Sequence, residues 1–208
     1  MADNKISCKN IATSSFPMAE DEVWRNLESV EFVDVKTGEH PFLSTSLRCF
    51  RDDAAKKLFF LFKGEDDNIF SYFRLKDEPL YQQDVFELFI ASSNDTSRYI
   101  ELEVSPHDVK FDGLISFSKD GSRKLDMSFD IPEWQTVTRF NKPKNRITSV
   151  WSIPYSAFDQ VPKAGTAWRF NAFRIDHSVR GVSYQAWQKT GEINFHVPEL
   201  FGYLCFEK

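Results

Sequence analysis

Three glutamates stand in strand-like segments that are otherwise apolar, and their spacing could support acid–base chemistry. The segments VFELFI (85–90) and YIELEV (99–104) carry Glu87, Glu101 and Glu103 among aromatic and branched side chains. Because side chains alternate across a strand, Glu101 and Glu103 share one face, with backbones about 6–7 Å apart. Carboxyl groups roughly 5–9.5 Å apart serve glycoside hydrolysis. Adjacent acids on a solvated strand are also ordinary, so hydrolysis stays an alternative to binding.

An arginine in a third segment could partner these acids. In WRFNAFRI (168–175), alternation places Arg174 on one face and Asn171 on the other. A carboxylate on a half-apolar face needs a partner, and a guanidinium offers a planar pair of donors. The pattern therefore predicts either a structural ion pair such as Glu87–Arg174 or a polar face that binds a ligand.

Several aromatic residues lie in polar segments, where a large ring has less structural reason to be. Trp187 occupies the segment SYQAWQKTGE, Tyr184 precedes it by three residues, and Tyr72 and Phe73 lie in another polar stretch. Flat rings beside carboxylates and amides suit sugars, because such sites are apolar with a few placed polar groups. Trp187 is thus a candidate stacking platform, with core packing as the alternative.

The elements that must position these residues are short strands. The chain contains 21 Phe, 6 Tyr and 5 Trp, and aromatic residues favour strands. Turn residues bound each apolar run, which is typical of an all-β sandwich, and no clean helical period is present. We predict one β-sandwich domain over residues 26–208, after an irregular N-terminal arm at 1–25. The expected strands are 58–62, 85–90, 99–104, 111–117, 147–153, 168–175 and 201–206.

Charge and hydropathy exclude several classes of function. The formal charge of −5 gives no general field for nucleic acid, and no apolar run approaches the ~18 residues of a membrane span. The start MADNKISCKNIATSSF lacks the apolar core of a secretory signal, which predicts a cytoplasmic chain if full length or a secreted one if an excised module. The three cysteines show neither a disulfide framework nor zinc spacing. We expect no nucleic-acid or membrane partner.

From about Trp24 onward, the chain resembles the carbohydrate-binding modules of family nine and their DOMON-like relatives. The resemblance rests on five blocks in order: DVFELFI (84–90), RYIELEVSP (98–106), WRFNAFRID (168–176), YQAW (184–187) and FHVPELFGYLCF (195–206). It implies a two-sheet antiparallel sandwich of the jelly-roll or immunoglobulin-like type. It also implies non-catalytic binding at the reducing end of a plant-type polysaccharide or oligosaccharide, in carbohydrate catabolism, with a glycoside hydrolase as partner.

The resemblance also assigns roles to residues. Glu87 and Arg98 match charged sites near the sugar hydroxyls, Asn171 and Arg174 match a polar pair, and Trp187 matches one of two stacking rings. The second stacking tryptophan has no clear counterpart, so Tyr72, Phe73 or Tyr184 would replace it. Structural calcium is implied as well, for which the acidic turns at 52–53, 65–68 and Asp120 are candidates; no cofactor is required for chemistry.

Haem binding is the remaining alternative, because some DOMON-like sandwiches hold haem through Met and His or Lys. The candidates are few: Met127, His107, His177 and His196. Met127 is expected to fill a gap in the packing, and His196 to be explained by packing within the FHVPE segment.

Overall fold

The computed structural model describes residues 4–207, and strands dominate this range. The strands are β1 (Lys5–Asn10), β2 (Val30–Glu31), β3 (Val33–Asp34), β4 (Thr45–Asp52), β5 (Lys57–Glu65), β6 (Val85–Ala91), β7 (Arg98–Val104), β8 (Lys110–Phe117), β9 (Arg123–Asp126), β10 (Gln135–Asn141), β11 (Arg146–Pro154), β12 (Ala167–Ser178), β13 (Gly181–Ala186) and β14 (Gly202–Phe206). Single 3₁₀ turns complete the elements: η1 (Glu22–Trp24), η2 (Leu80–Gln82), η3 (Lys142–Lys144), η4 (Tyr155–Ala157) and η5 (Pro198–Leu200). The predicted all-β class is confirmed. No helix within residues 4–207 is long and apolar enough to cross a membrane.

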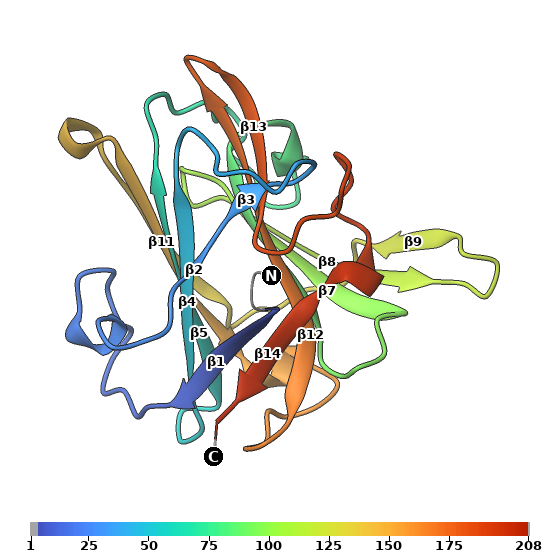
Figure 1. The fold of residues 1–208 in the computed structure, drawn as a ribbon. Coiled ribbons are helices and arrows are strands. Elements are labelled where there is room, and N and C mark those ends of the chain that lie inside the picture. Colours follow the sequence, from blue (N-terminus) through green and yellow to red (C-terminus); the bar gives the residue numbers. More distant parts are fainter. Residues whose placement is uncertain (1–3, 208) are drawn as a thin grey trace.

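Most of the strands form one hydrogen-bonded path that folds into two layers (Figure 1), and β2, β3 and β13 pair beside this path. The first layer contains β10, β11, β5 and β4, and the second contains β14, β12, β6, β7, β8 and β9. Strand β1 joins them, because it pairs in parallel with β14 through Lys5–Cys8 and with β4 through Lys9–Asn10. The predicted purely antiparallel pairing is therefore wrong at β1. The finer assignment to a jelly-roll, immunoglobulin-like or DOMON-like topology stays a prediction.

Strand β1 also corrects the prediction of an irregular N-terminal arm at residues 1–25, of which residues 1–3 lie outside the described range. Ile6 and Cys8 are fully buried in the core, and the turn η1 buries Trp24 against Phe50. The strand is short and its outward positions are Lys5, Ser7 and Lys9, so its apolar alternation is confined to two residues. Its place beside β14 depends on pairing with the far end of the chain.

Aromatic rings fill the space between the layers, which accounts for the many phenylalanines. Phe62 of β5 stacks on Phe86 of β6 with centroids 4.8 Å apart, and Phe60 lies 6.2 Å from Phe170 of β12. Alternation along β6 and β7 turns one apolar face of each strand toward this core, which contains Phe86, Leu88, Ile90, Ile100, Leu102 and Val104. The opposite faces of the same strands therefore point away from it.

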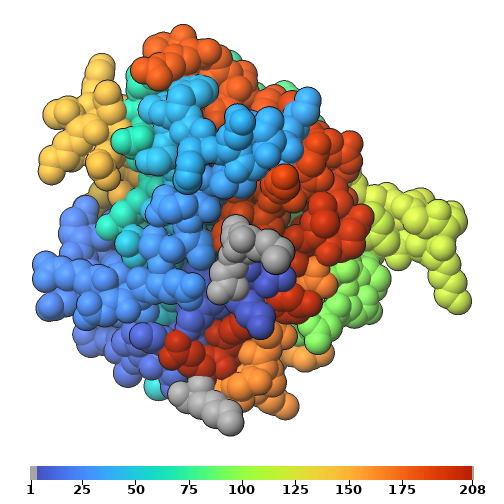
Figure 2. All heavy atoms as spheres, in the orientation of Figure 1, coloured from blue at the N-terminus to red at the C-terminus, as the bar shows by residue number. Residues whose placement is uncertain are grey.

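A second apolar cluster lies on that outer face and shapes the candidate site. Phe89 of β6, Tyr99 of β7 and Phe173 of β12 pack there with Leu80 and Phe195 from covering loops. The β8–β9 hairpin stands out from the body beside the C-terminal segment (Figure 2). Loops and hairpin thus rise around the outer face of the second layer instead of leaving it flat.

Candidate functional site

A cavity of about 650 Å³ opens on the outer face of the second layer. Its floor is made by β6, β7 and β8, and its walls by the η2 segment, the hairpin strand β9 and the loop 193–196. A volume of this size is typical of small-molecule sites, which are lined by apolar and aromatic side chains with a few polar groups. The polar groups at the floor are Glu87, Glu101 and Glu103, which the sequence analysis identified from their positions in strands.

The register of β6 and β7 brings Glu87, Glu101 and Glu103 together. Glu87 lies directly opposite Glu103, and Glu101 is two residues farther along the same face. One carboxylate oxygen from each lies within 4.8 Å of the others. Glu87 and Glu103 are each 1% exposed, and Glu87 Oε1 and Glu103 Oε2 have no hydrogen-bond partner within residues 4–207. Buried acceptors without partners are costly, so a ligand that donates to them would be stabilised.

Burial changes the protonation of this glutamate cluster. Desolvation, and then the neighbouring glutamates, raises the pKa of Glu87 and Glu103 well above the usual range. Desolvation raises the pKa of Glu101 to about 7, opposed by the Arg123 guanidinium. Near neutral pH the cluster therefore holds protons and presents both O–H donors and carboxylate acceptors.

We predict that this cluster makes folding stability fall as the pH rises. A carboxyl with a raised pKa in the folded state binds protons more tightly there than in the unfolded chain. The contribution of Glu101 is therefore fully present below about pH 4.5 and is lost as the pH approaches its folded pKa of about 7. Glu101→Gln should reduce the loss of unfolding free energy between pH 5 and 7 by about 1–2 kcal/mol. Urea denaturation at both pH values measures it.

Glu133→Gln is the control for that comparison, because Glu133 is exposed and lies outside the cavity. It should leave the pH slope as in the wild type. If the unfolding free energy of Glu101→Gln depended on pH as that of the wild type does, the raised pKa of Glu101 would be contradicted.

Aromatic side chains form the walls above the glutamate cluster. Tyr81 of η2 is 55% exposed, and Phe195 stacks on Phe173 with centroids 4.3 Å apart and planes 8° from parallel. Tyr184 of β13 also lines the cavity, as the sequence led us to expect of a ligand-binding aromatic. The sequence analysis did not predict Tyr81 or Phe195. The signal that singled out Tyr72, an aromatic ring in a polar segment, is also present at Tyr81, which is followed by Gln82 and Gln83.

Arg174 does not belong to this cavity. It pairs with Phe86 in the β6–β12 register and shares the core face, whereas Glu87 pairs with Phe173 on the outer face. The predicted Glu87–Arg174 ion pair is therefore wrong, because the sheet separates the two side chains. The sequence analysis expected Arg174 to bind ligand, but Arg174 does not line this cavity.

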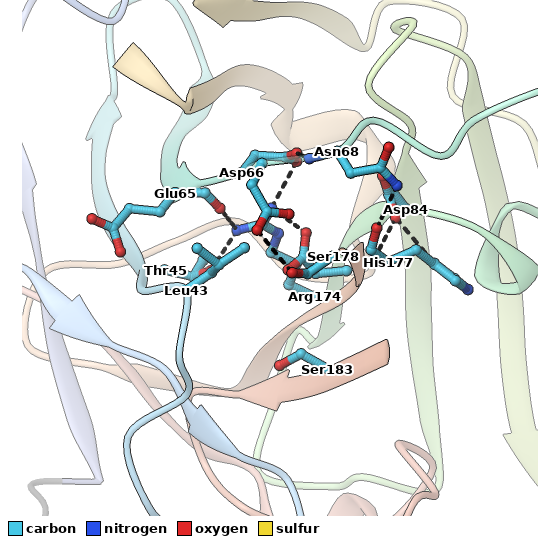
Figure 3. Close-up of polar contacts among 12 residues, drawn as sticks. Leu43, Thr45, Glu65, Asp66, Asn68, Asp84, Arg174, His177, Ser178 and Ser183 are labelled. Carbon is cyan, nitrogen blue, oxygen red and sulfur yellow. Dashed lines mark hydrogen bonds and ion pairs between the residues drawn. The ribbon is translucent and has the colours of Figure 1, made fainter. Parts of the chain in front are cut away.

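Arg174 instead neutralises a buried acidic cluster (Figure 3). Its Nη2 donates to Asp66 Oδ2 at 2.9 Å and to Asp176 Oδ1 at 2.8 Å, and its Nη1 donates to Thr45 and to the Glu65 carbonyl. Burial raises the pKa of Asp66 to about 7 and that of Asp176 to about 6, and the guanidinium opposes both shifts. The arrangement is a structural ion-pair network in the core.

Asp84, Asp66 and Asp176 form a group of carboxylates that could hold a cation, because one oxygen of each lies within 4.8 Å of the others. Asp84 accepts hydrogen bonds from the Phe70 amide and from the amide and Nδ1 of His177. Since Arg174 already supplies positive charge to the other two carboxylates, these residues fit a calcium ion poorly. The structural calcium implied by the resemblance stays a prediction.

Trp187 and Asn171 are placed in the interior. Trp187 is 5% exposed, lies 4.8 Å from Phe170 between centroids, and packs so closely on Gly202 that a Cβ there would come within 2.5 Å of its ring. Trp187 also lines a separate hollow together with Lys189. Asn171 is fully buried and exchanges hydrogen bonds with the backbone of Gln188. The expected stacking face of Trp187 is covered, and core packing, the alternative, describes it.

The other expected site residues lie apart from the cavity. Arg98 forms a surface ion pair with Asp159 at 2.8 Å, and Tyr72 is 69% exposed on a loop. Phe73 packs on the outer apolar cluster without lining the cavity. Of the ten residues expected to bind ligand, Tyr184, Glu87, Glu101 and Glu103 line this cavity.

Two of the residues considered for haem also reach the cavity. Met127 is 52% exposed there, so its expected role as a filler of packing gaps is wrong. His196 stacks on Phe89 and its Nδ1 shares a 2.7 Å hydrogen bond with the Tyr99 hydroxyl, which agrees with a packed histidine. Haem binding stays an untested alternative.

An aromatic-walled cavity with buried polar groups, on a β-sandwich, defines a ligand-binding module. The chain belongs to the family "Carbohydrate family 9 binding domain-like", whose model matches residues 18–208. The family consists of carbohydrate-binding, non-catalytic modules. A relative described as "Extracellular protein", from Arthroderma benhamiae, is 27% identical in an alignment of 193 positions that covers 85% of this chain and 85% of the relative.

Solved structures share the fold at low sequence identity. A crystal structure from Bacteroides uniformis has a TM-score of 0.75 and 17% identity, covering 98% of this chain and 99% of the other. A family 9 carbohydrate-binding module from Caldicellulosiruptor kristjanssonii in complex with cellotriose has a TM-score of 0.66 and 16% identity, covering 98% and 93%. The same kind of module in complex with glucose has a TM-score of 0.63 and 16% identity, covering 98% and 95%.

Proposed function

We propose that this protein binds carbohydrate without transforming it and that the ligand occupies the cavity over Glu87, Glu101 and Glu103. The observation that carries the proposal is the combination of unpartnered buried carboxyl oxygens with aromatic walls. A pyranose presents C–H groups to a ring face such as that of the exposed Tyr81, and its hydroxyls hydrogen-bond with the glutamates. Family membership and the sugar complexes of structural relatives support this assignment.

We further propose that the ligand is the reducing end of a β-linked glucan or related oligosaccharide. The size of the cavity suits a terminal unit or a short oligosaccharide better than a long chain lying flat. The relatives that contain glucose and cellotriose make glucose-based chains the first to test. A glycoside hydrolase partner and a role in carbohydrate catabolism stay predictions.

Isothermal titration calorimetry with cello-, xylo- and mannotriose, each intact or reduced to its alditol, tests both proposals. We expect saturable binding of an intact trisaccharide and a loss of at least about tenfold in affinity for its alditol, because a ring can stack and a linear alditol cannot. Equal affinity for both forms would contradict the chain-end assignment alone. Absence of binding to all six ligands would contradict carbohydrate binding.

Glycoside hydrolysis is the second candidate, because three acids with raised pKa values meet in one cavity. In glycosidases, however, the two carboxyl groups flank the scissile bond, whereas these three lie together on neighbouring strands of the floor. We expect no release of reducing sugar from cello-oligosaccharides over prolonged incubation. Turnover by the wild type that disappears in Glu101→Gln would overturn the non-catalytic assignment.

A further inference from the structure

Acidic groups outnumber basic groups in the lining of the cavity. Four carboxyl groups line it, from Asp77, Glu87, Glu101 and Glu103, against one guanidinium, from Arg123. Arg123 is exposed on the β9 hairpin, so it compensates only weakly for Glu87 and Glu103 at the floor. Within residues 4–207, no lysine or arginine forms a salt bridge with the three glutamates, and the nearest basic group is the imidazole of His196, whose Nε2 lies 3.8 Å from Glu101 Oε1.

Two features of the cavity suit an organic cation. The unpartnered oxygens Glu87 Oε1 and Glu103 Oε2 offer acceptors to an N–H donor, and a charge-assisted hydrogen bond is stronger than one from a neutral hydroxyl. The aromatic walls add ring faces, which attract a positive charge by cation–π interaction. A neutral sugar would use the stacking faces but would supply no positive charge to favour ionised glutamates.

We propose that the cavity selects an amino sugar, a β-1,4-linked 2-amino-2-deoxyglucose whose ammonium group lies against the glutamate cluster. This inference rests on the proposed carbohydrate function and names the class of sugar. The ammonium group donates up to three hydrogen bonds, whereas the hydroxyl that it replaces donates one. The glutamate cluster thereby distinguishes the amine from both the hydroxyl and the acetamido group.

Binding of an ammonium group should also release protons. The raised pKa values of Glu87, Glu101 and Glu103 fall when a cation comes close, so protons held by the cluster leave on binding. Other charged, titratable or hydrogen-bonding groups also face the cluster from neighbouring elements. These are Asp77 and Tyr81 from the η2 segment, Arg123 from β9, Tyr184 from β13, and His196 with its partner Tyr99. Binding of neutral disaccharides should release no protons.

Three disaccharides that differ only at C2 give the sharpest test: cellobiose, N,N′-diacetylchitobiose and fully deacetylated chitobiose. Calorimetry at pH 6 after treatment with EDTA, in two buffers of different ionisation enthalpy, yields both affinity and proton release. We expect deacetylated chitobiose to bind about tenfold tighter than cellobiose, as one additional charge-assisted hydrogen bond predicts. Proton release should accompany the binding of deacetylated chitobiose and not the binding of the other two disaccharides.

The variant Glu103→Gln keeps the shape of the side chain and removes one ionisable carboxyl group. It should abolish the preference for the amine, so that deacetylated chitobiose and cellobiose bind the variant with affinities within about threefold of each other, whatever loss the two ligands share. Glu133→Gln, exposed and outside the cavity, should behave as the wild type. A preference retained in Glu103→Gln would overturn the inference.

The outcomes separate this inference from the proposed function. Cellobiose binding as tightly as deacetylated chitobiose would overturn the amino-sugar preference and leave carbohydrate binding intact. Failure of all three disaccharides to bind, together with failure of the trisaccharides, would overturn both. Binding of calcium chloride alone that is lost in Glu103→Gln, without binding of the amine, would also overturn the inference, because the cluster would then be a metal site.

Discussion

Arg174→Leu should lower the free energy of unfolding by about 3–5 kcal/mol, because breaking a buried ion pair leaves uncompensated charge. Arg174 is 2% exposed, and its loss would leave Asp66 and Asp176, each fully buried, without the guanidinium that neutralises them. The packing of the guanidinium on Phe86, 5.3 Å from the ring centroid, would be lost as well. Guanidinium chloride denaturation measures the change in the midpoint and slope.

The matched control is Arg98→Leu. Arg98 forms an ion pair with Asp159 at the same 2.8 Å, but its side chain is half exposed. Exposed pairs of this kind contribute about 0–1 kcal/mol. Similar losses in the two variants would contradict the account of Arg174. Carbohydrate affinity of the folded Arg174→Leu protein should match the wild type, because Arg174 lies on the other side of the sheet from the cavity.

Tyr81→Ala should weaken carbohydrate binding by about 2 kcal/mol or more, the loss expected of an aromatic anchor at a binding site. Tyr81 is 55% exposed at the cavity wall, so its removal deletes a ring face that a sugar would contact. The same exposure means that little core packing is lost, and the melting temperature should change little. Calorimetric titration of the variant with the best ligand measures the effect.

Tyr72→Ala is the control for Tyr81→Ala. Tyr72 is also exposed and also lies in a polar segment, but it does not line the cavity. It should bind carbohydrate as the wild type does. The reverse result, with binding lost in Tyr72→Ala and retained in Tyr81→Ala, would move the site away from the cavity.

The glutamate cluster could be predicted because it depends on local rules. Alternation along a strand puts Glu101 and Glu103 on one face, and β6 and β7 are consecutive strands that pair in an antiparallel manner. The register that sets Glu87 opposite Glu103 is then a consequence of a short connection. The same rule predicts that Ile100, Leu102 and Val104 share a face of β7, and all three lie in the core.

The partner of Arg174 could not be predicted in this way. Its ion pairs join β12 to Asp66, 108 residues away in the sequence, and strand alternation carries no information about such pairing. The aromatic walls posed a similar problem, because Tyr81 and Phe195 lie in segments without a repeating pattern. Trp187 was expected at the ligand and lies in the core. The polar sequence around an aromatic ring does not determine whether the chain buries that ring.

A crystal structure of the protein with the tightest-binding oligosaccharide tests the central claim most directly. We predict density for a sugar ring beside Tyr81 and Phe195, with hydroxyl or amino groups within hydrogen-bonding distance of Glu87 and Glu103. Density for the sugar in the hollow beside Trp187 and Lys189, with the glutamate cluster left uncontacted, would contradict it.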